Sequence, residues 1–104
     1  MVSTRPDGRV EFRFLAPGAT RVQVVGDFTN WLTEPMEMAP IEQGWWKVSP
    51  RLGAGEYRFR YLVDGRWHTD FAAFGVAAND FGQFDSILVV PPRVQTGSQP
   101  IAAA

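Results

Sequence analysis

Two tryptophans and one arginine are the residues best suited to bind a ligand. Trp31 lies in a polar segment and Trp67 directly follows a predicted hairpin, so both indoles are candidates for partial exposure. Arg60, in the strand before that hairpin, adds a cation with several N–H donors. Exposed indoles beside such a donor suit a ligand with apolar faces and hydroxyl edges. Sugars fit this description, and protein partners fit it as well, so the pattern alone leaves both open.

Residue sets with the spacing of a catalytic or metal site are missing from the sequence. The chain has no cysteine and a single histidine, His68, so these residue types supply no zinc ligand set. The eleven acidic residues are scattered among turns, and no pair is marked as the two converging carboxylates that a glycosidase needs. We therefore expect a non-catalytic domain without a metal or another cofactor.

Composition favours one folded domain and excludes two classes of partner. The chain has 104 residues, of which 45% are hydrophobic and 13% aromatic, enough for one core. A net charge of -1 argues against nucleic acid, which needs a basic surface, and does not support binding to an anionic membrane. No apolar run has the length of a membrane span, and residues 1–6 lack the apolar core of a signal peptide. We expect a cytoplasmic protein.

The strand expected to carry Arg60 covers residues 57–63. Aromatic and β-branched residues at the odd positions alternate there with Arg58, Arg60 and Leu62. This period of two predicts one apolar face toward a core and a mostly cationic face opposite. Asp64-Gly65 follows directly and is a strong hairpin signal, because glycine tolerates a positive φ. The hairpin should carry Trp67 back along the same sheet.

Further short strands are expected on both sides of this hairpin. They are predicted at residues 10–15, 21–25, 34–38, 45–49 and 86–90. Ten glycines and eight prolines fit turns between strands. Residues 68–84 show no period and are interpreted as an ordered loop with aromatic anchors. About seven short strands and no helix of normal length predict an all-β fold, an antiparallel sandwich.

The sandwich is expected to span residues 10–91. Residues 1–9 are interpreted as a polar lead-in, and residues 92–104 as a flexible tail or linker remnant. Trp46 is expected in the core, whereas its neighbour Trp45 must face the opposite side of the sheet.

Three runs of the sequence resemble one known family. They are residues 12–19 (FRFLAPGA), 22–31 (VQVVGDFTNW) and 55–67 (GEYRFRYLVDGRW). In this order and spacing they resemble the family 48 carbohydrate-binding modules, which include the glycogen-binding domain of the AMP-activated protein kinase β subunit and the front domains of isoamylases and glycogen-branching enzymes. The resemblance covers roughly residues 10–90. It implies an immunoglobulin-like β-sandwich that binds α-1,4-linked glucans such as glycogen, starch and maltooligosaccharides.

The resemblance also implies which residues contact the sugar. Trp31 and Trp67 match two indoles that stack on glucose rings. Arg60 matches a lysine that hydrogen-bonds sugar hydroxyls, and the change keeps the charge but alters the geometry.

Three more contacts are implied near the last strand. Phe81 matches a leucine that pushes into the ring of the glucan. Gln83 and Asp85 match a threonine and an asparagine that contact sugar hydroxyls. A carboxylate accepts hydrogen bonds but cannot donate as an amide does. If Asp85 pairs with Arg60 instead, the sugar contacts would weaken.

Two functions therefore remain open. The preferred one is a non-catalytic module for α-glucan polysaccharides or oligosaccharides, which predicts Trp31 and Trp67 on one exposed surface with Arg60 between them. The alternative is a protein-interaction or architectural domain that packs on a glucan-active enzyme or another partner, either in trans or as a further domain, and binds little sugar. In that case Trp31 or Trp67 would be an interface anchor. That alternative predicts a broader apolar patch that extends to Trp45.

Overall fold

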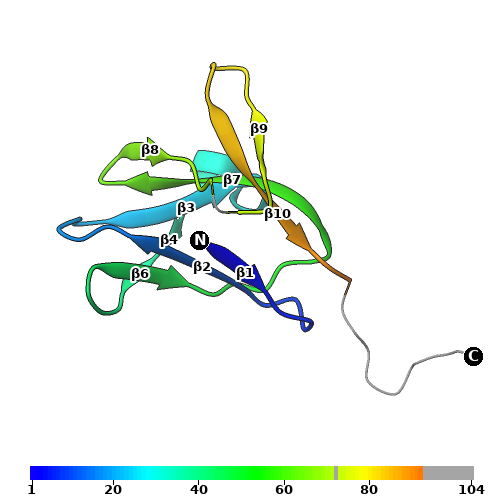
Figure 1. Cartoon of the computed structure of the whole chain (residues 1–104), viewed down its shortest axis with the longest axis horizontal. Helices are drawn as coiled ribbons and strands as arrows, with labels where there is room; N and C mark the ends of the chain where they lie inside the picture. The colour runs from blue at the N-terminus through cyan, green and yellow to red at the C-terminus, as the bar shows by residue number, and fades with distance from the viewer. Residues whose placement is uncertain (72, 93–104) are drawn as a thin grey trace, which may run out of the picture.

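The computed structural model describes residues 1–71 and 73–92, which form two antiparallel sheets packed face to face (Figure 1). The first sheet has the strand order β1 (Val2–Thr4), β2 (Val10–Leu15), β6 (Trp45–Val48), β5 (Ala39–Pro40). The second has the order β4 (Met36–Glu37), β3 (Val22–Gly26), β7 (Gly55–Val63), β10 (Phe84–Val90), β9 (Val76–Ala78), with β8 (Arg66–His68) paired to β7. The predicted all-β antiparallel sandwich is confirmed.

The described residues contain more strands than the roughly seven that were predicted. Val2–Thr4 pairs with β2, with Val2 opposite Phe12, so the interpretation of residues 1–9 as a mere polar lead-in is wrong. Three residues are too few to display a period, and only the pairing with β2 makes them a strand. The predicted tail lies outside the described residues from position 93 onward.

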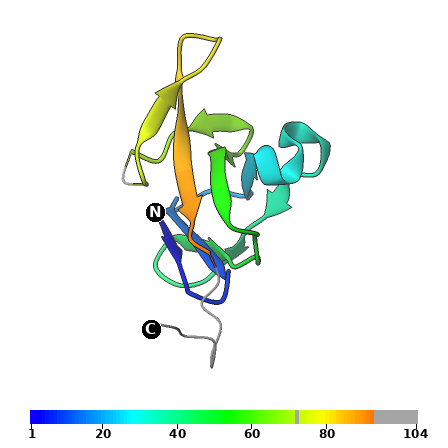
Figure 2. The same cartoon turned by 90° about the vertical axis from the view of Figure 1, so that its right-hand side faces the viewer.

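The segment predicted as a loop between His68 and Phe84 also contains a strand. Val76–Ala78 forms β9 and pairs with β10, with Ala77 opposite Asp85. This correction has a simple cause, because Val-Ala-Ala carries no alternation and alanine has little preference for strands. The β9–β10 hairpin projects beyond the other strands in two perpendicular views (Figure 1, Figure 2).

The core lies between the sheets and is rich in aromatic rings. Phe12 and Phe59 meet edge to face with their centroids 5.1 Å apart, and both are fully buried. Trp46 is buried as predicted, and its indole N–H donates to the Ala16 carbonyl at 3.2 Å. The apolar face of β7 therefore points into the core, which leaves Arg58 and Arg60 on the outer face of the second sheet.

The buried hydroxyl of Tyr61 is paired with an acidic group. Tyr61 donates to Oδ2 of Asp70 at 3.1 Å, and the Asp70 amide donates to Ser86 Oγ at 2.6 Å. Burial, and then the adjacent Asp70 carboxylate, raise the pKa of the Tyr61 hydroxyl far above its usual range.

The free energy of unfolding is expected to fall when the pH is raised above about 10. In that range the unfolded chain releases the Tyr61 proton, whereas the folded protein keeps it. The folded state then binds more protons than the unfolded state, so each further rise in pH lowers stability. Urea denaturation should give a lower free energy of unfolding at about pH 11 than at about pH 8, and the difference between the two values should be smaller for Tyr61→Phe. Equal losses in both proteins would contradict this account.

Two features are missing from the described residues. No helix there is long and apolar enough to cross a membrane. No group of three or more His, Cys, Asp or Glu side chains in the same part of the chain is arranged to hold a metal ion.

Candidate functional site

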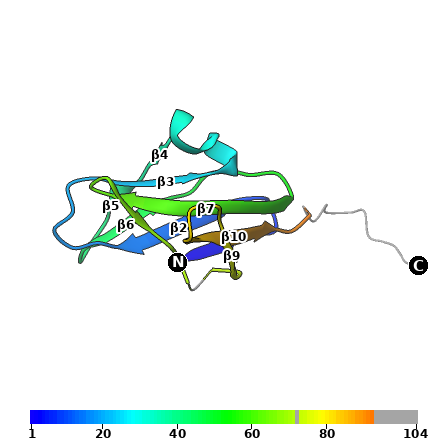
Figure 3. The same ribbon diagram turned by 90° about the horizontal axis from the view of Figure 1, so that it is seen from above.

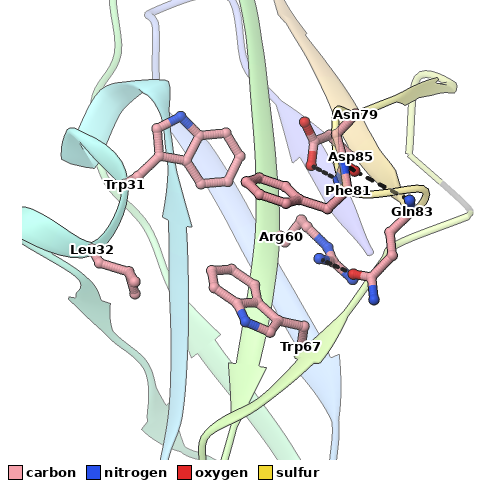
Figure 4. A pocket seen from close by; sticks show the side chains of 8 residues that line it. All are labelled: Trp31, Leu32, Arg60, Trp67, Asn79, Phe81, Gln83 and Asp85. Carbon is pink, nitrogen blue, oxygen red and sulfur yellow. Dashed lines mark hydrogen bonds between the residues drawn. The ribbon is translucent and has the colours of Figure 1, made fainter.

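A half-open groove of about 560 Å³ lies on the outer face of the second sheet (Figure 4). Its walls come from four separate parts of the chain. The lining residues are Trp31, Leu32, Arg60, Trp67, Asn79, Phe81, Gln83 and Asp85. All six residues predicted from the sequence line this one groove, and Leu32 and Asn79 join them. The groove is large enough for a small ligand or a few units of a polymer.

Trp31 is placed by the connection between β3 and β4. Two short 3₁₀ turns, Asp27–Thr29 and Trp31–Thr33, stand on the side of β3 that faces away from β2 (Figure 3). The Phe28 ring packs on Phe12 with the centroids 5.5 Å apart, so Phe28 anchors the connection to the core. Asp27 Oδ2 accepts a hydrogen bond from the Arg58 amide at 2.8 Å, which ties the connection to β7. These anchors leave Trp31 pointing away from the core.

The backbone at Trp31 is held in an unusual conformation. Asn30 and Trp31 both have a positive φ, 51° and 54°, which is rare for a bulky side chain. The buried Thr29 hydroxyl stabilises it, because Oγ1 accepts from the Gly26 amide at 2.9 Å and lies 2.8 Å from the Trp31 carbonyl, to which it donates. Thr29 therefore sets where the Trp31 indole points.

Thr29→Val is expected to lower the free energy of unfolding by about 1–3 kcal/mol, because it leaves the buried Gly26 amide and the partly buried Trp31 carbonyl without this partner while nearly keeping the volume. Urea denaturation measures the change, and tryptophan fluorescence reports whether the Trp31 environment alters. Thr29→Ser keeps the hydroxyl and is the matched control. A valine variant as stable as the parent would show that the hydroxyl does not hold this turn.

Trp67 is placed by the predicted hairpin. Asp64 and Gly65 have φ values of 50° and 81°, as a tight two-residue turn requires, and they return the chain so that Trp67 lies opposite Leu62. The Trp67 side chain is 39% exposed. The Asp64 carboxylate also accepts the Arg21 amide at 2.8 Å, which fixes the hairpin to the start of β3. The interpretation of Asp64 as a turn residue is confirmed.

Arg60 joins Trp67 to the opposite wall of the groove. Its guanidinium carbon lies 5.1 Å from the centre of the Trp67 ring, within the range of a cation–π contact. Its Nη1 donates to Gln83 Oε1 at 2.7 Å. With only 8% of its surface exposed, Arg60 forms part of the floor of the groove. Its buried Nε has no hydrogen-bond acceptor among the described residues.

Phe81 reaches into the groove from the β9–β10 hairpin. It is 88% exposed, and its ring lies between the two indoles in Figure 4. The hairpin turn that carries it contains Gly82 with a φ of 74°, a conformation that suits glycine. Three aromatic rings from three different segments therefore border one groove.

The Asp85 carboxylate is buried and interacts with other side chains of the protein. It is 6% exposed, its Oδ1 accepts from Asn79 Nδ2 at 3.1 Å, and its Oδ2 lies 3.8 Å from Arg58 Nη1. The alternative in which Asp85 pairs with Arg60 is wrong for a simple reason. Arg60 turns toward Gln83 and Trp67, whereas Arg58 is the cation beside Asp85.

The two lining residues that were not predicted had weak local signals. Leu32 follows Trp31 directly and looks like any apolar loop residue. Asn79 is a common turn former two residues before Phe81, and its side chain bonds to the backbone there. That local role could have been inferred, but its position in the groove depends on the pairing of β9 with β10.

The comparison with known families decides what this domain is. Residues 7–96 match the family described as the glycogen recognition site of AMP-activated protein kinase. The chain belongs to this family. The resemblance to the family 48 carbohydrate-binding modules is thereby confirmed, over nearly the whole chain.

Other relatives of this glycogen-recognition domain are much longer proteins. The 1,4-alpha-glucan branching enzyme GlgB of Burkholderia pseudomallei is 42% identical over 59 residues, 55% of this chain and 8% of that protein. GlgB of Pseudomonas putida is 45% identical over 64 residues, 57% of this chain and 9% of that protein. Protein PTST homolog 2, chloroplastic, of Arabidopsis thaliana is 35% identical over 52 residues, which are 50% of this chain and 10% of that protein. The domain thus spans a tenth or less of these relatives.

A solved structure supports the fold of the glycogen-recognition domain. A Salmonella typhimurium protein described as a candidate alpha amylase aligns with a TM-score of 0.56 and 22% identity, over 78% of this chain and 13% of that one. This likeness shows the sandwich fold.

Proposed function

We propose that the groove binds α-1,4-linked glucans such as glycogen, starch and maltooligosaccharides, without cleaving them. The observation that carries this proposal is the convergence of Trp31 and Trp67 on one groove whose floor is Arg60, within a domain of the glycogen-recognition family. The two indoles offer apolar faces to glucose rings. The Gln83 amide and the guanidinium of Arg60 offer donors to hydroxyl edges.

The expected affinity is modest. Stacking of bases on aromatic rings contributes about 1–3 kcal/mol per ring, and sugar faces should lie at the low end of that range. Two such contacts and a few hydrogen bonds to a wet ligand give a Kd of roughly micromolar to millimolar. A branched polymer presents many sites, so its apparent affinity rises without new contacts.

The groove offers little for glycosidic cleavage. Asp85 is its one carboxylate among the eight lining residues, and both of its oxygens are directed to protein partners. Cleavage by the common mechanisms uses two carboxylates, one on each side of the scissile bond. We therefore assign binding, and no chemical step, to this groove.

One observation favours the alternative of docking to a glucan-active enzyme. Three phenylalanines that do not line the groove, Phe71, Phe74 and Phe84, are exposed. Such rings suit a protein interface. Under this alternative, the domain would bind little sugar, and changes at these phenylalanines would weaken its association with the enzyme.

Native gel electrophoresis with embedded glycogen or amylopectin tests the proposed function. The parent domain should migrate more slowly than in a gel without polymer, while a β-linked glucan at the same concentration should leave its migration unchanged. A folded parent that is not retarded by either α-glucan would refute binding at useful strength. The docking alternative would then be preferred.

A further inference from the structure

We propose that Asn79 is a positioning residue that holds Phe81 and Gln83 in the geometry needed for binding. This inference rests on the proposed function and assigns to Asn79 the organisation of one wall of the groove. Asn79 follows β9 and begins the turn that leads into β10. The residue itself lines the groove (Figure 4).

Three hydrogen bonds converge on the Asn79 side chain. Its Oδ1 accepts from the amide of Phe81 at 2.9 Å and from the amide of Gln83 at 3.1 Å. Its Nδ2 donates to Asp85 Oδ1 at 3.1 Å. The Asn79 backbone amide also donates to the Gln83 carbonyl at 2.9 Å, which closes the turn. One amide group thus fixes the backbone on both sides of the Phe81 ring.

The same contacts extend across the groove. Gln83, held by Asn79, accepts from Arg60, and Arg60 lies against Trp67. On the other side Asp85, which accepts from Asn79, is adjacent to Arg58. Asn79 therefore connects the hairpin to the floor formed by β7. A change at this residue should alter the position of Phe81 most directly, because the Phe81 amide bonds to the Asn79 side chain.

Asparagine is chemically suited to this position. Its carbonyl oxygen has two lone pairs for the two amides, and its NH₂ group supplies the donor that the buried Asp85 carboxylate needs. An aspartate would keep the acceptor but place a second carboxylate beside Asp85. An alanine would remove all three side-chain contacts.

The effect on binding follows from the exposure of Phe81. A ring that is 88% exposed has few contacts of its own to hold it, so its position depends on the backbone of the turn. Without Asn79 the turn must be ordered when the ligand binds. We expect Asn79→Ala to weaken glycogen binding about three- to tenfold.

Amide hydrogen exchange of the protein without ligand tests the positioning directly. In Asn79→Ala the amides of Phe81 and Gln83 should exchange faster than in the parent. Asp80→Ala is the matched control, because Asp80 is exposed in the same turn and its side chain makes no hydrogen bond to the described residues. Unchanged exchange at both amides in Asn79→Ala would overturn the proposal, whether or not the parent binds glycogen.

Asn79→Asp adds a readout that a general loss of folding would not produce. The charged groups that face position 79 are Asp85, Arg58 beside it and Arg60 through Gln83, and Asp80 flanks it. At about pH 7.5 the two adjacent carboxylates repel, whereas at about pH 5 they can share a proton. The affinity of the variant relative to the parent should therefore be higher at the lower pH.

The outcomes separate this inference from the proposed function. A parent that does not bind glycogen refutes the function, and the exchange experiment still decides the role of Asn79 in the turn. A parent that binds, with Asn79→Ala binding equally well, refutes the role of Asn79 in binding alone. If the affinity of Asn79→Asp relative to the parent is the same at both pH values, the contact between position 79 and Asp85 is contradicted.

Discussion

Trp67→Ala is expected to abolish the retardation of the domain in glycogen gels. The substitution removes one of the two stacking surfaces and also the ring on which the Arg60 guanidinium lies, 5.1 Å from its centre. The loss of one aromatic contact, about 1–2 kcal/mol, lowers the affinity roughly five- to thirtyfold, and the freed Arg60 side chain adds to this. For a ligand held this weakly, such a loss takes binding below detection. A titration with a maltooligosaccharide, monitored by tryptophan fluorescence, measures the change in affinity.

Trp31→Ala should have a similar effect, and Trp45→Ala provides the matched control. Trp45 also carries an arginine, with the Arg13 guanidinium carbon 5.4 Å from its ring centre, but it lies on β6 in the other sheet. The control thus removes an indole–arginine pair of the same kind outside the groove. If Trp45→Ala lost glycogen binding and Trp67→Ala retained it, the groove would not be the binding site.

Gly26→Ala is expected to cause the largest loss of stability among single changes near the site. A Cβ at this position would lie 2.9 Å from the Phe59 Cβ and 3.0 Å from the Phe28 ring, and closer still to the carbonyl oxygen of Arg58. The backbone there is extended, so the cost is steric and does not arise from φ. Because β3 and β7 cannot separate without losing their pairing, we expect a loss of about 2–3 kcal/mol or complete unfolding.

Urea denaturation of Gly26→Ala beside Gly53→Ala tests this prediction. At Gly53 the nearest atom would be 3.8 Å from the added Cβ, an ordinary contact. The Gly53 variant should therefore stay close to the parent, because it fills open space. A Gly26 variant with the same midpoint as the parent would show that β3 and β7 can move apart there. Retained folding with lost glycogen binding would instead show a local displacement of Trp31.

The sequence alone determined the elements in which local pattern and local chemistry agree. The alternation over residues 57–63 places Phe59 and Tyr61 in the core and Arg60 on the outer face, because side chains of a strand alternate between two faces. Asp64-Gly65 determined the hairpin because the turn needs positive φ at both residues. Trp31 and Trp67 could be predicted as ligand-binding candidates, because Trp31 lies in a polar loop segment and Trp67 directly follows the hairpin turn.

The tertiary structure decided everything that depends on which strands pair. Val2–Thr4 and Val76–Ala78 carry no alternation, and they become strands because β2 and β10 offer free edges. The partner of Asp85 was decided by side-chain contacts between strands, because Arg60 turns toward Gln83 and Trp67, and Arg58, which pairs with Ile87 in the register of β10 on β7, is the cation beside Asp85. Asn79 enters the groove only when β9 pairs with β10. Hydrogen bonds between distant segments set these contacts, and no local period in the sequence encodes them.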